Sequence, residues 1–213
     1  MGSVGLYPGD YVFNGQGYDC NASGLYRFWD GSSSVIHSRL VYANDIYGYM
    51  SAFAWHQIHG SEDETTNYQA AATAGMTHKW RMRCGPISGL VNWFMGLWSL
   101  QSRVVSLLTL GPKNGEDDGH VAIEVFDGGK WKLWDIDNGV YFTQNGVHLS
   151  AAEIIAAGIL NCQRVAIDGD SRNAASLAAP TGLCMGSYGD MFLRTPADFD
   201  AWFARIYQSW SVA

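Results

Sequence analysis

The clearest pattern along this chain is an apolar repeat that begins just after Pro86. Large apolar side chains recur at every third or fourth position, at Ile87, Leu90, Val91, Phe94 and Trp98. This spacing is that of one face of an α-helix, and apolar residues on its other sides predict that the helix is largely buried. Proline suits a first helical turn, because the N–H that it lacks would be unpaired there. The pattern therefore predicts a buried helix that begins at or just after Cys84.

Strand-forming segments follow this helix. They are rich in β-branched and aromatic residues and are predicted at 103–110, 120–126 and 130–137. The sequence Asp127-Gly128-Gly129-Lys130 joins the last two and is a strong signal for a tight β-hairpin. Asn138-Gly139 predicts another turn, which leads into a short strand at 140–143.

A further helix is predicted before Cys84, over residues 61–75. Ser61 or Asp63 is the expected N-cap, acidic residues occupy the first turn, and Gly75 ends the helix. The first 50 residues are rich in Tyr, Gly, Ser and Asn, and their short β-type segments predict twisted hairpins.

Two helices are predicted in the last third of the chain. Ser150 and Glu153 have the spacing of a capping box, and an amphipathic segment opens at Thr195 and extends to Trp210. Residues 168–190, between them, are predicted as a long loop.

These elements predict the α+β class, with the Cys84-bearing helix packed on an antiparallel sheet. The length of 213 residues suits a single domain. We expect three parts within it: a Tyr/Gly-rich N-terminal arm at 1–60, a core at 62–140, and a C-terminal loop with helices at 141–213.

Composition narrows the range of partners. The chain is 47% hydrophobic and 15% charged, which is enough apolar material for a sizeable core. Its net charge of −7 argues against nucleic-acid or anionic-membrane partners, because both would repel it. The N-terminal sequence lacks the basic start and apolar stretch of a signal peptide, and no segment is long enough to span a bilayer. We therefore expect a cytoplasmic location.

The four cysteines are too widely spaced for a disulfide framework or a structural zinc site. Cys20, Cys84, Cys162 and Cys184 include no C-x-x-C pair. Reduced thiols are expected, each either a small buried hydrophobe or a reactive group. We predict no metal site and no cofactor.

The predicted hairpin brings an imidazole beside a carboxylate. A two-residue turn at Gly128-Gly129 sets a register in which His120 faces Asp137 directly and Asp135 diagonally, all on one face of the sheet. An imidazole oriented by a carboxylate is one half of a nucleophilic triad, and a cysteine at a helix start supplies the other half. Both the helix N-terminus and a nearby imidazolium favour the reactive thiolate. Backbone N–H groups at the helix start are placed to hold an oxyanion.

These motifs, taken together, resemble the transglutaminase-like superfamily of papain-like cysteine acyl-transfer enzymes. The segments that carry the resemblance lie within residues 62–140 and are "CGPISGLVNWF" with Cys84, "SRVV" with Arg103, "GHVAIEV" with His120 and Glu124, and "WKLWD" with Trp131 and Asp135. The resemblance implies a transglutaminase-like or cysteine-proteinase fold, with Cys84 as nucleophile, His120 as acid and base, and Asp135 as the residue that orients it; Asp137 is the alternative orienter. Such enzymes often add a side-chain oxyanion donor, for which Trp80, Trp55 and Gln69 are the candidates.

The expected function is a cysteine-dependent acyl transfer that cleaves or exchanges an amide bond through a thioester. The substrate would be a peptide or another amide, and either hydrolysis or transamidation is open. The alternative is a non-catalytic module on the same scaffold that binds a peptide or glycan through the Tyr/Trp-rich arm. The sequence does not indicate an oligomeric state.

Overall fold

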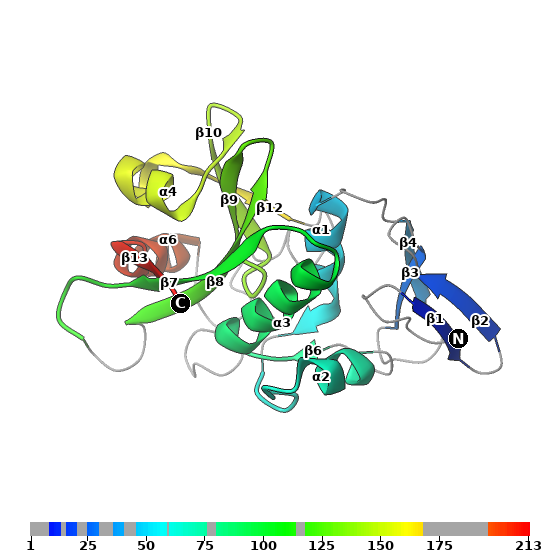
Figure 1. The fold of residues 1–213 in the computed structure, drawn as a ribbon. Helices are drawn as coiled ribbons and strands as arrows, with labels where there is room; N and C mark the ends of the chain where they lie inside the picture. Colours follow the sequence, from blue (N-terminus) through cyan, green and yellow to red (C-terminus); the bar gives the residue numbers. More distant parts are fainter. Residues whose placement is uncertain are drawn as a thin grey trace.

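The computed structural model describes residues 9–13, 16–20, 25–29, 36–40, 46–58, 60–75, 80–113, 118–167 and 196–213. Its centre is an antiparallel sheet with the strand order β13-β7-β8-β9. The bounds are Ser102–Leu108 for β7, Gly119–Asp127 for β8, Lys130–Trp134 for β9 and Ser209–Val212 for β13. Helix α3 (Cys84–Leu97) lies across β7 and β8 (Figure 1). The predicted α+β class is confirmed.

The central sheet has a hydrophobic core on each face. On one face, α3 contributes the fully buried side chains of Ile87, Leu90, Val91, Phe94 and Met95. Ile123 and Val125 of β8 belong to this first core, whereas Ala122 packs with Leu133 and Phe203 in the second core. The alternation follows from the two-residue period of a strand. His120 and Glu124 each lie two positions from Ala122 on β8, so their side chains point to the same face of the sheet as Ala122.

The β8–β9 hairpin forms in the predicted register. Gly128 and Gly129 have φ angles of 61° and 84°, which suits a tight turn that glycine adopts without strain. Phe126 faces Trp131, and Glu124 faces Leu133. The expected strand over 130–137 is too long, however, because β9 ends at Trp134.

Asp135 ends β9 by starting a turn. Its backbone pairs with Val140, and its Oδ1 accepts a hydrogen bond from the Asn138 N–H at 3.1 Å. Gly139, with φ of 65°, completes the reversal into β10 (Val140–Gln144). The β8–β9 ladder therefore ends before Asp137. We expected His120 to face Asp137 directly if the register continued, and this expectation is wrong.

A smaller sheet continues from this turn and has the strand order β11-β10-β12. Its outer strands are β11 (Val147–His148) and β12 (Gln163–Ala166). Helix α4 (Ala151–Ala157) and the 3₁₀ helix η1 (Ile159–Asn161) connect them. The capping box is confirmed: Ser150 Oγ accepts from the Glu153 N–H at 3.3 Å, and Glu153 Oε2 accepts from the Ser150 N–H at 2.8 Å.

The C-terminal segment contributes a helix and an edge strand. Helix α6 (Pro196–Ile206) packs on the second core, and β13 then pairs with β7. The predicted helix extended to Trp210 and was therefore too long. The hydrogen-bonding groups at the edge of β7 account for the difference, because a strand at 209–212 satisfies them.

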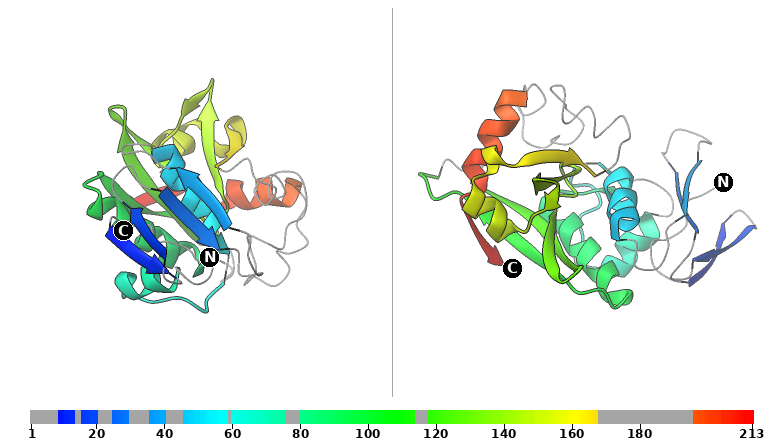
Figure 2. Two further views of the ribbon diagram at one scale, coloured as in Figure 1. Left: turned by 90° about the vertical axis from the view of Figure 1, so that its right-hand side faces the viewer. Right: turned by 90° about the horizontal axis from the view of Figure 1, so that it is seen from above.

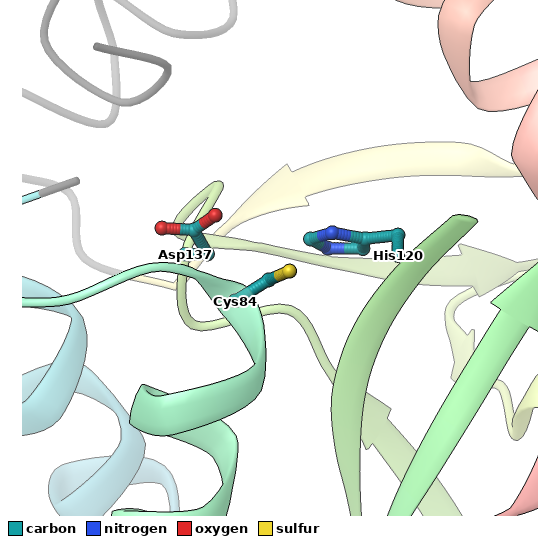
Figure 3. A group of neighbouring side chains, drawn as sticks. All are labelled: Cys84, His120 and Asp137. Atoms are coloured by element: carbon teal, nitrogen blue, oxygen red, sulfur yellow. The ribbon is translucent and has the colours of Figure 1, made fainter. Parts of the chain in front are cut away.

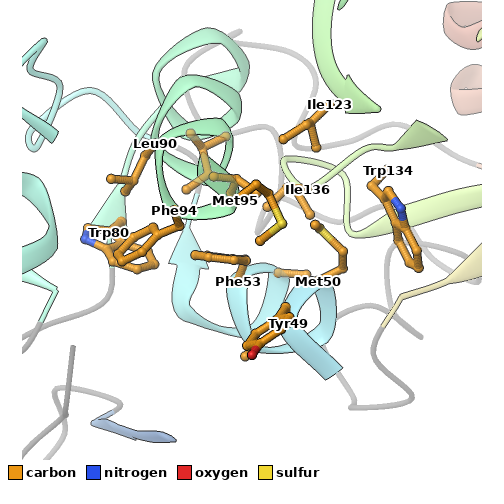
Figure 4. Close-up of a cluster of buried hydrophobic side chains, with 14 of the residues drawn as sticks. Tyr49, Met50, Phe53, Trp80, Leu90, Phe94, Met95, Ile123, Trp134 and Ile136 are labelled. Atoms are coloured by element: carbon orange, nitrogen blue, oxygen red, sulfur yellow. The ribbon is translucent and has the colours of Figure 1, made fainter. Parts of the chain in front are cut away.

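Helix α1 (Ile46–His56) was not predicted. Its residues are apolar on nearly every side, so the sequence contains no amphipathic stripe. Met50 and Phe53 are fully buried in the first core, and the ring of Phe53 lies 5.3 Å from that of Phe94 on α3 (Figure 4). Helix α1 thus contributes to the first core.

The segment between α1 and α3 departs from the expected helix at 61–75. Helix α2 covers only Tyr68–Ala74, and its start is capped by Asn67 Oδ1, which accepts from the Ala70 N–H at 3.0 Å. The acidic residues expected in its first turn pair instead with the segment that precedes Cys84. Asp63 accepts from the Arg81 N–H at 2.8 Å, and Glu64 accepts two hydrogen bonds from the Arg83 guanidinium and one from the Arg83 N–H.

The remaining strands are short. β5 (Gln57–Ile58) runs parallel to β6 (Trp80–Arg81). The hairpins β1–β2 (Gly9–Phe13, Gln16–Cys20) and β3–β4 (Leu25–Trp29, Ile36–Leu40) confirm the expected N-terminal hairpins. They lie beyond α1, at the opposite end from α6 and β13 (Figure 2). Among the described helices, none has the length and apolar character that crossing a membrane requires. The predicted loop at 168–190 lies outside the described residues.

Candidate active site

Cys84 is the first residue of α3. Arg83 is its N-cap and has extended backbone angles, and the first helical hydrogen bond runs from the Ile87 N–H to the Arg83 carbonyl. Cys84 is a free, half-buried cysteine. The first N–H groups of a helix have no acceptor within it, and they give this end a partial positive charge. The thiol is therefore at a position that favours an anion.

His120 and Asp135 form a buried pair. The Nε2 of His120 lies 2.9 Å from Oδ1 of Asp135, and their side chains are 3% and 0% exposed. The imidazole also lies edge-on to Trp202 of α6, with 5.2 Å between ring centres. The predicted partnership of His120 with Asp135 thus has hydrogen-bonding geometry.

Asp135 is fixed by donors from two other residues. Its Oδ2 accepts from Asn138 Nδ2 at 2.8 Å and from the Tyr207 hydroxyl at 3.3 Å, in addition to the Asn138 N–H at Oδ1. Burial and the Asp135 carboxylate raise the pKa of Tyr207 well above its usual value, so its phenol stays protonated and donates. Both oxygens of Asp135 thus accept hydrogen bonds, which fixes the orientation of its side chain.

His120 has a raised pKa. Burial disfavours the imidazolium, but the interactions with Asp135 and Cys84 outweigh it and raise the pKa of His120 well above its usual value. Because Nε2 faces Asp135, Nδ1 is the nitrogen left for the thiol. The ligand atoms of Cys84, His120 and Asp137 all lie within 4.8 Å of one another, and Figure 3 shows the sulfur pointing toward the ring.

Asp137 also lies at this site, where it is hydrogen-bonded to Gln57. The side chain of Gln57, which is fully buried, donates from Nε2 to Asp137 Oδ1 at 2.8 Å and to the Met82 carbonyl at 2.8 Å. Gln57 therefore links the turn that carries Asp137 to the segment that leads into Cys84. With its thiol, imidazole and carboxylate, the same group of Cys84, His120 and Asp137 also has the ligand types of a metal site.

Sequence reasoning missed Gln57, Asn138 and Tyr207. Asn138 was recognised only as part of an Asn-Gly turn, and its role depends on where β9 ends. Gln57 and Tyr207 reach the site from elements distant in sequence, and no local pattern marks such contacts.

The three oxyanion candidates have different positions. The Trp80 indole N–H donates to the Ala71 carbonyl at 2.8 Å inside the first core, so this group is not available at Cys84, and the expectation is corrected. Gln69 is exposed on α2. Trp55 belongs to α1, but its side chain lies outside the described part of the structure.

Arg103 and Glu124, which contributed to the resemblance, form an ion pair beside the hairpin, in which Glu124 is fully buried. Arg103 Nε donates a hydrogen bond to Glu124 Oε2 at 2.7 Å, within an ion pair between the two side chains. The guanidinium carbon of Arg103 also lies 4.1 Å from the centre of the Trp131 ring. Glu124 Oε1 accepts from the Ala151 N–H at the start of α4, at 2.6 Å. The pair thus joins the central sheet to the smaller sheet region.

Comparisons of the chain with models of protein families, with curated proteins and with solved structures found no match.

Proposed function

We propose that this protein is a cysteine-dependent acyl-transfer enzyme of transglutaminase-like type that acts on an amide bond. One observation supports it above all others. A half-buried thiol at a helix N-terminus lies within 4.8 Å of an imidazole nitrogen of His120, and Nε2 of the same ring lies 2.9 Å from the buried carboxylate of Asp135. Nucleophile, proton carrier and orienting acid are thus in the order that covalent catalysis requires.

In the proposed reaction, the Cys84 thiolate attacks the amide carbonyl and forms a tetrahedral intermediate. The C–N bond then breaks, the imidazolium of His120 gives its proton to the departing amine, and a thioester remains on Cys84. Water, or a second amine, attacks the thioester after giving a proton to His120. The thiolate is thereby released with the acid or the new amide as product.

Asp135, rather than Asp137, is the orienting carboxylate in this proposal. It contacts Nε2 and is itself held by Asn138 and Tyr207. Its charge keeps the tautomer and orientation of the ring and stabilises the imidazolium. Backbone N–H groups at the start of α3 are the proposed oxyanion donors.

The exposure of the three side chains indicates which substrates could reach the sulfur. Cys84 is half-buried, whereas His120 and Asp135 are almost fully buried. A substrate can therefore reach the sulfur while the imidazole and the carboxylate stay shielded from bulk water. A peptide or other amide that presents its carbonyl at the N-terminus of α3 meets these conditions.

The test compares thiols within the same chain. Iodoacetamide at slightly acidic pH should label Cys84 much faster than Cys162, because burial raises the pKa of Cys162. Incubation with a mixture of peptide amides should then leave an acyl group on Cys84, detected by mass spectrometry of the intact protein and its peptides. A Cys84→Ala variant should lose the adduct, and the matched Cys162→Ala variant should keep it. Equal, slow labelling of both thiols and no adduct would instead favour a binding module.

A further inference from the structure

We propose that Cys84, His120 and Asp137 also form a site for a divalent zinc ion. Zinc is bound in proteins by thiolate, imidazole and carboxylate groups, at about 2.0–2.3 Å. One ligand atom from each of these residues lies within 4.8 Å of the others (Figure 3). Small side-chain rotations bring such atoms onto one ion, and three protein ligands leave a fourth position for water.

The groups behind these ligands have the arrangement that metal sites use. A metal-binding histidine usually donates its second ring N–H to a carboxylate, which fixes the ring and increases its basicity. His120 does so through Nε2 to Asp135, leaving Nδ1 for the ion. A ligating carboxylate is usually hydrogen-bonded as well, and Asp137 accepts from Gln57 Nε2 at 2.8 Å. Asp135 and Gln57 thus orient two of the three proposed ligands.

The charge of the site favours a cation. Asp135 and Asp137 place two acidic side chains beside one imidazole, both at most 3% exposed, and a metal-bound Cys84 adds a thiolate. Among the residues that the structure describes just before Cys84, Arg81 pairs with Asp63 and Arg83 pairs with Glu64. A divalent ion between sulfur and carboxylate reduces this repulsion in a region of low dielectric constant. On binding, the thiol–imidazole pair releases one proton to solvent.

Zinc at this site would switch the proposed enzyme off. The ion takes the sulfur electron pair that attacks the carbonyl and the His120 nitrogen that carries the proton, so a thioester cannot form. This consequence rests on the proposed function, whereas zinc binding itself does not. Asp137 would then serve the metal-bound state, while Asp135 orients His120 in both states.

The test measures zinc binding directly on metal-free protein. Competition with a chromogenic zinc indicator should give one zinc per chain, and zinc should protect Cys84 from iodoacetamide until EDTA is added. Cys84→Ala and Asp137→Asn should each weaken zinc binding by at least about tenfold. The side-chain amide in Asp137→Asn keeps an oxygen that can accept from Gln57, and circular dichroism checks the fold of this variant. The matched Cys162→Ala variant should bind zinc like the wild type.

The outcomes separate the two proposals. Absence of a one-to-one complex, or equal zinc affinity in the wild type and Asp137→Asn, would overturn the zinc site and leave the acyl-transfer proposal standing. Zinc binding with the expected variant pattern, but without an acyl group on Cys84 of metal-free protein, would support the zinc site and overturn the acyl-transfer proposal.

Discussion

The hydroxyl of Tyr207 donates a hydrogen bond to Asp135 across 72 positions of the sequence, at 3.3 Å. Tyr207 follows α6, whereas Asp135 begins the turn after β9. The bond therefore ties the C-terminal helix to the carboxylate that faces His120.

Replacing Tyr207 by Phe should slow iodoacetamide labelling of Cys84 and lower the free energy of unfolding by about 1–2 kcal/mol. The variant keeps the ring that packs on Phe142 and Phe203 but removes one donor from a buried carboxylate. Labelling rates and urea unfolding measure the two effects. Tyr47→Phe, on a half-exposed ring, is the control and should leave the labelling rate unchanged; equal rates in all three proteins would contradict the role of Tyr207.

Asp135→Asn should lower the pKa of His120. Burial alone favours neutral imidazole, and the Asp135 charge is a main cause of the raised pKa. The wild-type ring should stay protonated through neutral pH and lose its proton only as the pH rises through the raised pKa. In the variant this loss should move to lower pH. NMR of the imidazole from about pH 5 upward, past the raised pKa of the wild type, measures it; identical His120 titrations would refute the assignment.

Gln57→Leu should destabilise the fold by about 1–3 kcal/mol, because it leaves the Met82 carbonyl and the Asp137 carboxylate without this donor. The side chains have similar size, so the loss reports the hydrogen bonds rather than a cavity. Denaturant unfolding measures the change. Gln144→Leu, on an exposed side chain of β10, is the control and should differ little from the wild type.

Glu124→Gln should destabilise the protein by about 3 kcal/mol. The fully buried Glu124 balances the charge of Arg103 and accepts from the Ala151 N–H, and the neutral amide leaves Arg103 uncompensated. Asp200→Asn is the matched control, because its carboxylate is 57% exposed and its pair with Arg164 should contribute less than about 1 kcal/mol. Similar midpoints of urea unfolding for Glu124→Gln and Asp200→Asn would contradict the prediction that the buried ion pair contributes more to stability than the exposed one.

Stability should fall as the pH drops from about 6.5 to about 4 because of His148. Burial lowers the pKa of this imidazole to about 4, while its Nε2–H donates to the Leu133 carbonyl at 2.6 Å. In this window the unfolded chain binds the proton and the folded chain does not, so acid favours unfolding, by at most about 3 kcal/mol. His148→Gln removes the titrating group and should give a shallower slope; parallel curves from denaturant unfolding across this range would exclude His148 as the cause.

Local patterns predicted the parts of the fold that local physics determines. The apolar spacing after Pro86 predicted a helix that begins at or just after Cys84, where α3 begins, and the Gly128-Gly129 turn set the register of β8 and β9. Both depend on side-chain periodicity or on backbone angles that glycine adopts easily.

The errors occurred where distant residues decide the structure. Asp137 was expected opposite His120, but the hydrogen bond from the Asn138 N–H to Asp135 ends the strand first. Trp80 resembled an oxyanion donor by position, yet the Ala71 carbonyl takes its N–H. Helix α1 has no polar face because its surroundings are largely protein, so its pattern resembles no surface helix.

The bond from Tyr207 to Asp135 also has a consequence for synthesis of the protein. Cys84, His120 and Asp135 leave the ribosome well before Tyr207 does, so a nascent chain contains the sulfur of Cys84 while the Asp135 carboxylate still lacks the phenol donor. Strand β13, which completes the edge of the sheet at β7, is translated later still. On the proposed function, full reactivity would therefore arise only after both segments have emerged, which limits acylation of neighbouring proteins by incomplete chains.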